Sequence, residues 1–250
     1  MPNESYRIFP LGDSALTVEF GNVISPELNQ KAIALADRIE NNPFPGLIET
    51  VPAYTTTTIF YDLLVVRQSF SEFPTAFEAV KQIVSYLITE PDVLTDCDSR
   101  LIEIPVIFDR ESEFDLGHVA DVHGLSIDEV IDIFTATTYR VYMLGFLPGF
   151  SYMGEVDERI ATPRKTNPRT LVPKSSIGIA SKQTGIYSLA SPGGWQIIGS
   201  TEIEMFTPNV ESPTFLKAGD IVQFVEQQKS TNRRIAGCQP ASLASEPLTR

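Results

Sequence analysis

Six basic side chains stand in a stretch of sequence that contains no acidic residue. This basic segment covers residues 159–201, where the chain-wide density of acidic residues would put about five. Clustered guanidinium and ammonium groups bind phosphate and carboxylate groups, so the segment favours a site for an anionic ligand. A solvated face or a charge-poor seam of a β-barrel is the alternative that composition leaves open. The six cations are Arg159, Arg164, Lys165, Arg169, Lys174 and Lys182.

Prolines and glycines occur repeatedly in the same segment. Pro163, Pro168 and Pro173 each precede a basic residue, and the run Ser191-Pro192-Gly193-Gly194-Trp195 follows them. Prolines fix the shape of a loop before a ligand arrives, and glycines let backbone N–H groups approach it. The single tryptophan suits either a stacking wall for a ligand or a place in the core.

A serine hydrolase is not supported, although parts of its motif occur. Gly12-Asp13-Ser14 is followed far along the chain by Asp115-Leu116-Gly117-His118, and a serine nucleophile needs a histidine base oriented by a carboxylate. In the esterase class with this motif, the Asp-x-x-His block lies near the C-terminus, whereas much of this chain follows it. Asp13 is the best catalytic carboxylate candidate, with a turn cap as its alternative. No residue is assigned as catalytic.

Metal and phosphate-loop motifs are missing from the sequence. His118 and His123 are the only histidines, and their spacing is not that of a zinc protease. Cys97 and Cys238 form neither a disulfide framework nor a zinc site. The run from Gly145 to Phe150 lacks the Gly-Lys-Ser/Thr ending of a P-loop. We therefore expect no metal site.

The first hundred residues predict a compact α+β module. A helix begins well at Ser25-Pro26-Glu27, because serine caps, proline suits the first helical position and glutamate suits the positive helix end. A second amphipathic helix is predicted over residues 75–89. The predicted strands cover residues 7–10, 15–20, 48–54 and 57–66.

The second half changes from helices to strands. After a polar linker over residues 90–100 and a strand over 101–108, helices are predicted over 115–123 and 126–137, the latter with a Ser126–Glu129 capping box. Short apolar runs then alternate with Gly, Pro and Ser turns, which indicates a β-barrel or sandwich. These runs cover residues 140–146, 177–180, 185–189, 195–198, 203–206 and 221–225.

Composition excludes several classes of protein. The 250 residues carry a formal net charge of −13, with 42% apolar and 20% charged residues. Such a chain is globular rather than wholly disordered, and its acidity opposes binding to nucleic acid or to an anionic membrane. The sequence starts without a signal peptide and contains no apolar run of about 18 residues. We therefore expect a soluble, cytoplasmic protein.

A long, ordered series of short motifs carries a family resemblance. With Leu11-Gly12-Asp13-Ser14-Ala15-Leu16 and Gly124-Leu125-Ser126, the series resembles the family of the 5-oxoprolinase B subunit, also named allophanate hydrolase subunit 1, with its carboxyltransferase C/D-type domain. The family includes the sporulation histidine-kinase inhibitor Kip, and the resemblance covers about residues 5–226. The series comprises the run Tyr139–Gly154, Ala161-Thr162-Pro163-Arg164, Asn167-Pro168-Arg169, Val172-Pro173, Ile177-Gly178-Ile179-Ala180, Gln183-Thr184-Gly185-Ile186-Tyr187, Ser191-Pro192-Gly193-Gly194-Trp195 and Ile197-Ile198-Gly199.

The resemblance implies an α+β fold with two domains. These are an N-terminal α+β sandwich domain over residues 1–95 and a cyclophilin-like β-barrel with two leading helices over residues 101–228. A tail over residues 229–250 is expected to be disordered. The implied partners are the companion C subunit of 5-oxoprolinase and a third, lactamase-type chain. Such a complex hydrolyses 5-oxoproline to glutamate with ATP, and this chain would be an ATP-dependent amide (lactam) hydrolase subunit that is inactive alone.

The implied chemistry suits the basic segment. Opening a lactam with ATP means transferring a phosphoryl group to the carbonyl oxygen, and cations and backbone donors stabilise that group. The small anionic substrate would then lie among eight residues. They are Arg164, Arg169 and Lys174 facing a phosphate or the substrate carboxylate, Gln183, Thr184 and Tyr187 orienting the substrate, and Gly193 and Gly194 offering N–H groups.

Two positions depart from the family pattern. Phe134 stands where a histidine is usual, and Ser200-Thr201-Glu202 stands where many members have Arg-Thr-Pro. Altered specificity, active groups supplied by a partner, a regulatory role and ordinary drift all stay open as explanations. The alternative function is therefore a non-catalytic protein that inhibits a sensor histidine kinase.

Overall fold

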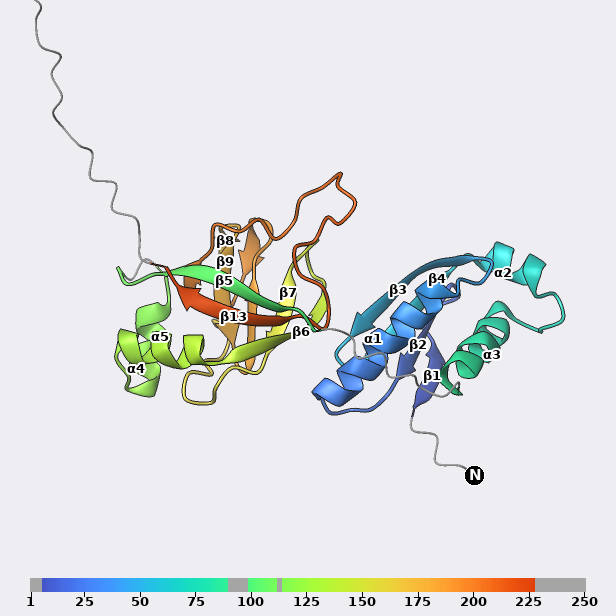
Figure 1. Cartoon of the computed structure of the whole chain (residues 1–250), viewed down its shortest axis with the longest axis horizontal. Coiled ribbons are helices and arrows are strands. Elements are labelled where there is room, and N and C mark those ends of the chain that lie inside the picture. Colours follow the sequence, from blue (N-terminus) through green and yellow to red (C-terminus); the bar gives the residue numbers. More distant parts are fainter. Residues whose placement is uncertain (1–5, 90–98, 112–113, 228–250) are drawn as a thin grey trace, which may run out of the picture.

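The structure, a computed structural model, describes residues 6–89, 99–111 and 114–227. Within these ranges the chain forms an N-terminal sheet with helices and a C-terminal β-barrel, which lie side by side in Figure 1. The α+β class and the barrel predicted from sequence are therefore confirmed. Most of the predicted linker and the whole predicted tail fall outside the described residues. No helix within these ranges is both long and apolar enough to cross a bilayer.

The N-terminal domain is an antiparallel sheet with strands in the order β1-β2-β4-β3. Helix α1 begins as predicted, since Ser25 Oγ accepts a hydrogen bond from Leu28 N at 3.2 Å and Pro26 is the first helical residue. The elements are β1 (Arg7–Pro10), β2 (Ala15–Glu19), α1 (Pro26–Asn41), β3 (Leu47–Ala53), β4 (Thr56–Tyr61), α2 (Leu63–Ser69) and α3 (Ala76–Thr89).

Helix α2 corrects the sequence-based prediction of one β-rich run over residues 57–66. The structure ends β4 at Tyr61 and begins α2 at Leu63. The Asp62 carboxylate accepts hydrogen bonds from the N–H groups of Leu64 and Val65, both at 2.9 Å. These bonds satisfy donors at the helix N-terminus, and this local gain outweighs the β propensity of the valines that follow.

The C-terminal domain is a closed barrel with strands in the order β10-β7-β6-β13-β5-β12-β9. Helices α4 (Leu116–His123) and α5 (Ile127–Ala136) lie together at one end of it (Figure 1), and α5 carries the predicted capping box. The barrel strands are β5 (Leu101–Phe108), β6 (Thr138–Leu144), β7 (Ser151–Gly154), β9 (Ser176–Ala180), β10 (Gln183–Ile186), β12 (Gln196–Ser200) and β13 (Ile221–Glu226).

Two segments of the C-terminal domain differ from the predicted barrel strands. Strands β8 (Arg169–Val172) and β11 (Ser191–Gly193) form a separate two-stranded ribbon, which the sequence did not predict. The strand predicted over residues 203–206 does not form, and Phe206 makes only an isolated bridge with Thr214. The ribbon therefore places Arg169 of the basic segment outside the barrel sheet.

Phe134, one of the two departures from the family pattern, is a core residue. Its side chain is fully buried and stacks on Phe224, with ring centroids 4.9 Å apart. It also contacts Phe108 and Tyr139 at centroid distances of 6.1 and 5.0 Å. An aromatic ring in this cluster stabilises the junction of α5 with the barrel through burial and edge contacts.

Candidate functional site

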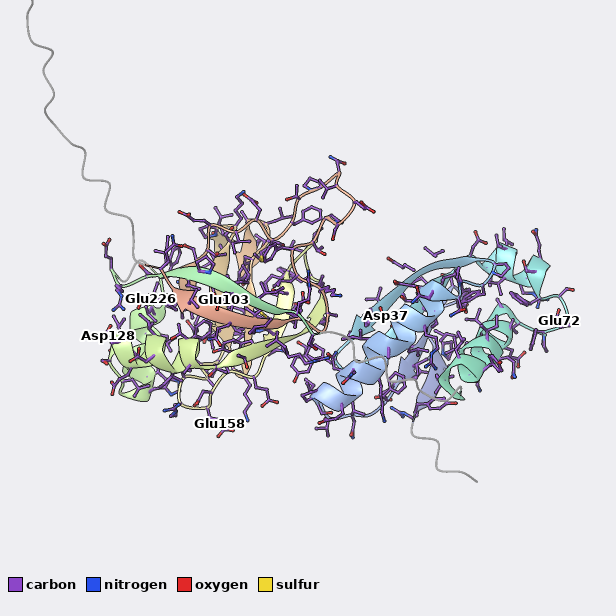
Figure 2. The ribbon with its side chains drawn as sticks, viewed as in Figure 1. Asp37, Glu72, Glu103, Asp128, Glu158 and Glu226 are labelled. Atoms are coloured by element: carbon purple, nitrogen blue, oxygen red, sulfur yellow. The ribbon has the colours of Figure 1, made fainter. Side chains whose placement is uncertain are left out.

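The cations of the basic segment reach carboxylates that lie outside it. Among the described residues, Arg164 is the one cation of the six with no salt bridge, and paired cations offer little net charge to a ligand. Of the six cations that composition suggested for an anion site, only Arg164 therefore stays unpaired among the described residues, and the search for the site centres on its surroundings. The ion pairs are Arg159–Asp157, Lys165–Asp115, Arg169–Asp115, Lys174–Glu204 and Lys182–Glu158, of which Glu158 is labelled in Figure 2.

Asp115, directly before α4, is the centre of a buried polar network. Lys165 Nζ donates to it at 2.8 Å, and Arg169 donates through both terminal nitrogens at 2.7 and 2.8 Å. The backbone N–H of Ile197 donates at 2.8 Å. Burial opposes the carboxylate's charge, but these hydrogen bonds outweigh it and lower the pKa of Asp115. Arg169 and Lys165 thus fasten the 163–169 loop to strand β12.

Arg164 extends from that loop over an aromatic surface. The guanidinium carbon lies 5.5 Å from the ring centroid of Trp195, a cation–π contact on an exposed side chain. Burial raises the pKa of Tyr152, and the nearby charge of Arg164 opposes that shift. The same charge acts on Tyr54 and Tyr187. Arg164 therefore stands within electrostatic reach of three phenols.

Two cross-strand glycines set the position of Trp195. Gly178 of β9 and Gly185 of β10 are register partners. A Cβ on Gly178 would lie 3.1 Å from the Trp195 Cβ, and one on Gly185 would lie 3.2 Å from the indole Cζ3 and 2.6 Å from the Ser151 carbonyl oxygen. No larger residue permits this approach. The glycines let the indole pack into the core at the barrel wall, where Trp195 is 5% exposed, and its ring centroid lies 5.9 Å from that of Tyr152.

Gln183 connects this surface to the N-terminal domain. Its Nε2 donates a hydrogen bond to the hydroxyl oxygen of Tyr54, which lies in the β3–β4 turn. The Tyr54 ring stacks on Tyr142 with centroids 5.7 Å apart and lies 6.5 Å from Tyr152. We call Tyr54, Tyr152 and Trp195 the aromatic face. Local sequence carries no signal for Tyr54, because its partners lie far away along the chain.

Three of the predicted substrate-binding residues take structural positions. Thr184 is fully buried, and its hydroxyl donates to the Gly178 carbonyl oxygen at 3.0 Å. Tyr187 is also buried, and its hydroxyl lies against Gly193. A Cβ on Gly193 would collide with that hydroxyl. The packing around Trp195 therefore includes three of the predicted residues, Thr184, Tyr187 and Gly193.

Gly194, Lys174 and Asp13 are also singled out from the sequence, and each has a different role in the structure. The Gly194 carbonyl oxygen accepts a hydrogen bond from Lys165 N at 2.7 Å. Lys174 is half exposed and pairs with Glu204. Asp13 is exposed between β1 and β2. The pKa of Tyr61 is raised mainly by the burial of that phenol and, to a smaller extent, by the negative charge of Asp13. The structure brings only Arg164 and Gln183 of the predicted set to the aromatic face, and no catalytic residue is assigned.

The side chains that could ligate a metal are scattered over the described parts of the chain. No three His, Cys, Asp or Glu side chains in residues 6–89, 99–111 and 114–227 are grouped to hold an ion. His123 Nε2 lies 3.1 Å from Thr162 Oγ1, and His118 is exposed on α4. The aromatic face with Arg164 and Gln183 remains the candidate functional site.

Comparison with known families defines the class of this protein. The family described as "Carboxyltransferase domain, subdomain C and D" matches residues 6–216. Three-dimensional comparison agrees, since a crystal structure of the protein TTHA0988 superposes with a TM-score of 0.73 at 36% identity. That match covers 86% of this chain but only 40% of TTHA0988, so the chain spans about two fifths of that longer protein. The chain is thus a carboxyltransferase C/D-type module.

Closer relatives narrow the assignment. The B subunit of 5-oxoprolinase from Bacillus subtilis (strain 168) is 46% identical over 221 residues, which are 88% of this chain and 92% of the relative. The corresponding B subunit from Escherichia coli O157:H7 is 34% identical over 89% of this chain and 97% of its own length. This chain belongs to the 5-oxoprolinase B-subunit family, as its motif series predicts.

Proposed function

We propose that this chain is a subunit of a heteromeric, ATP-dependent 5-oxoprolinase and that Arg164 binds the substrate carboxylate over the aromatic face. Arg164 is the observation that carries the proposal. It is the one cation of the basic segment without a carboxylate partner among the described residues, and it lies on an indole in a chain of the 5-oxoprolinase B-subunit family. Because the complex needs ATP, we propose that it works in the cytoplasm.

The chemistry of 5-oxoproline suits these groups. The substrate carries one carboxylate on a small, flat lactam ring, and a guanidinium binds a carboxylate through two parallel hydrogen bonds. Tyr152 is partly exposed and offers a flat apolar surface for the ring, and Gln183 offers an amide group near it. Arg169 and Lys165 act as positioning residues through Asp115.

ATP itself does not fit this face. A triphosphate carries several negative charges, whereas Arg164 is the single uncommitted cation of the basic segment in the described ranges. The proposal therefore assigns ATP and the phosphoryl-transfer step to a partner chain, either the companion C subunit of 5-oxoprolinase or a third, lactamase-type chain. The role of this chain is to bind and orient the anionic substrate, and it is inactive alone.

The test is 5-oxoproline-dependent ATP hydrolysis by this chain alone and with its companion chains. We expect turnover only in the mixture. Arg164→Ala should lower kcat/KM about 10- to 100-fold through a raised KM, because a charge-assisted bidentate contact is lost. Arg159→Ala, which removes an exposed cation of the same segment, is the matched control and should leave kcat/KM unchanged.

Two results contradict the proposal. Equal kcat/KM for Arg164→Ala and the unsubstituted complex would remove Arg164 from the site. An assembled complex without any 5-oxoproline-dependent ATP hydrolysis would refute the enzymatic role and turn the search to inhibition of a histidine kinase.

A further inference from the structure

Tyr54 reaches the aromatic face from the other domain in a conformation that few side chains adopt. Its φ is +38°, in the left-handed region that favours glycine. Such a conformation persists only where the surroundings enforce it, and it is concentrated at functional sites. Here the enforcing contacts are the stack on Tyr142 and the hydrogen bond from Gln183, both on the barrel.

Asn29 of α1 fixes the backbone that carries Tyr54. Its side chain is fully buried, and Nδ2 donates to the carbonyl oxygens of Tyr54 at 3.0 Å and Tyr142 at 2.9 Å. Its Oδ1 accepts a hydrogen bond from Arg140 Nε at 2.9 Å. A buried amide is tolerated only when it is paired. One side chain thus joins α1, the β3–β4 turn and barrel strand β6.

The Tyr54 hydroxyl keeps one proton that a ligand could accept. Its oxygen accepts from Gln183 Nε2, and no acceptor for its own proton occurs among the described residues. Burial raises the pKa of Tyr54 to about 12, so the phenol keeps its proton at neutral pH. Ring contacts connect the two donors: the Arg164 guanidinium carbon lies 5.5 Å from the Trp195 ring centroid, which is 5.9 Å from that of Tyr152, and the Tyr152 centroid is 6.5 Å from that of Tyr54.

We propose that Tyr54 is a further binding residue, which donates its O–H to the same anionic group that Arg164 binds, and that Asn29 is its positioning residue. The site is then shared between the domains and is complete only when the N-terminal domain is docked on the barrel. The proposal rests on the proposed function for the identity of the ligand, a carboxylate on a small lactam. The geometry of the donors does not depend on that identity.

Trp195 gives a direct test that needs no turnover, because it is the only tryptophan of the chain and forms part of the face. The full chain is titrated with 5-oxoproline, and separately with inorganic phosphate, while Trp195 fluorescence is followed. We expect saturable binding of 5-oxoproline and about tenfold weaker binding by Tyr54→Phe, which lacks one donor to a charged group. Tyr86→Phe, on exposed α3, is the matched control and should bind like the unsubstituted chain.

Asn29→Asp tests the positioning role. It removes both Nδ2 donors, and Asn41→Asp on the exposed surface of the same helix is its control. We expect Asn29→Asp to weaken binding about as much as Tyr54→Phe and to add nothing in a Tyr54→Phe background. Additive losses would show that Asn29 does not act through Tyr54. If Asn29→Asp fails to fold, the Tyr54→Phe titration still decides the proposal.

The outcomes separate this inference from the proposed function. Unchanged affinity in Tyr54→Phe overturns the inference, as does the absence of a saturable response to either probe in the unsubstituted chain. Weaker 5-oxoproline binding by Tyr54→Phe, together with an assembled complex that shows no turnover, would uphold Tyr54 as a binding residue and refute the 5-oxoprolinase role. If Tyr54→Phe weakens the binding of phosphate but not that of 5-oxoproline, Tyr54 is an anion-binding residue and the lactam is excluded as its ligand.

Discussion

Asp115 determines which cations of the basic segment are available to a ligand. It is 3% exposed and accepts hydrogen bonds from Arg169, Lys165 and a backbone N–H. Removing one partner of a buried ion pair is costly because the other charge stays buried without compensation. Arg169 and Lys165 are therefore tied to a structural carboxylate, whereas the exposed Arg164 has no salt bridge among the described residues.

Asp115→Asn is expected to destabilise the fold by about 3 kcal/mol at pH 7, since it removes the charge that Arg169 and Lys165 neutralise. The folded-state pKa of Asp115 is lowered, so its stabilisation is present above an ordinary aspartate pKa of about 4 and is lost as pH falls through the lowered value. Urea unfolding at pH 7, 5 and 3 should show a flatter pH dependence for Asp115→Asn.

Asp121→Asn, on the exposed surface of α4, is the matched control for that experiment. It should retain the full acid sensitivity of the unsubstituted chain. Equal acid sensitivity in Asp115→Asn would mean that another carboxyl group carries the pH dependence.

A glycine pair on strands β9 and β10 makes room for Trp195 of the aromatic face. Gly178 and Gly185 leave room for Trp195 and Phe150, so the depth of the indole depends on the absence of two side chains. Interiors are packed closely enough that one added methyl group must be accommodated by a shift. The glycines of the motif series thus have a packing role in the site.

Gly185→Ala is expected to destabilise the barrel by about 1–3 kcal/mol, because its Cβ would lie 2.6 Å from the Ser151 carbonyl oxygen. It should also shift the emission of Trp195. Gly194→Ala is the control next to the same tryptophan, since its Cβ would meet only ordinary contacts at 3.5 Å and beyond. A melting temperature and emission spectrum unchanged in Gly185→Ala would refute the packing role.

The whole chain combines acidic residues on both domains with a candidate site at the boundary between them. The acidic residues labelled in Figure 2 come from both domains, for example Asp37 on α1 and Glu103 on β5. The boundary is joined by polar contacts of Asn29 and by the stack of Tyr54 on Tyr142. Because a few side chains make these contacts, the docking of the domains should be sensitive to single substitutions.

Asn29→Asp is expected to uncouple the domains in calorimetry. The unsubstituted chain should unfold in one cooperative transition, whereas the variant should show an earlier transition for the N-terminal domain. A loss of 1 kcal/mol lowers the melting temperature of a domain of this size by about 4–8 °C. Asn41→Asp should keep the single transition. A single transition displaced as a whole in Asn29→Asp would show that other contacts couple the domains.

Local interactions made part of this protein predictable from its sequence. The Ser25 cap of α1 and the capping box of α5 join residues three positions apart, so their patterns are visible in the chain itself. The motif series also predicted the family and the barrel. The β prediction at residues 62–66 was wrong because the Asp62 cap competed with strand propensity.

The site depended on contacts between distant residues, which no local pattern reports. Sequence alone determined that an acid-free, Gly- and Pro-rich segment presents six cations. Only the tertiary structure decided that Asp115 binds Arg169 across 54 residues and that Tyr54 meets Gln183 across 129. Pairing between distant residues follows from how the strands register and how the domains dock. For that reason the sequence predicted the kind of ligand, and the fold decided which side chains are free to meet it.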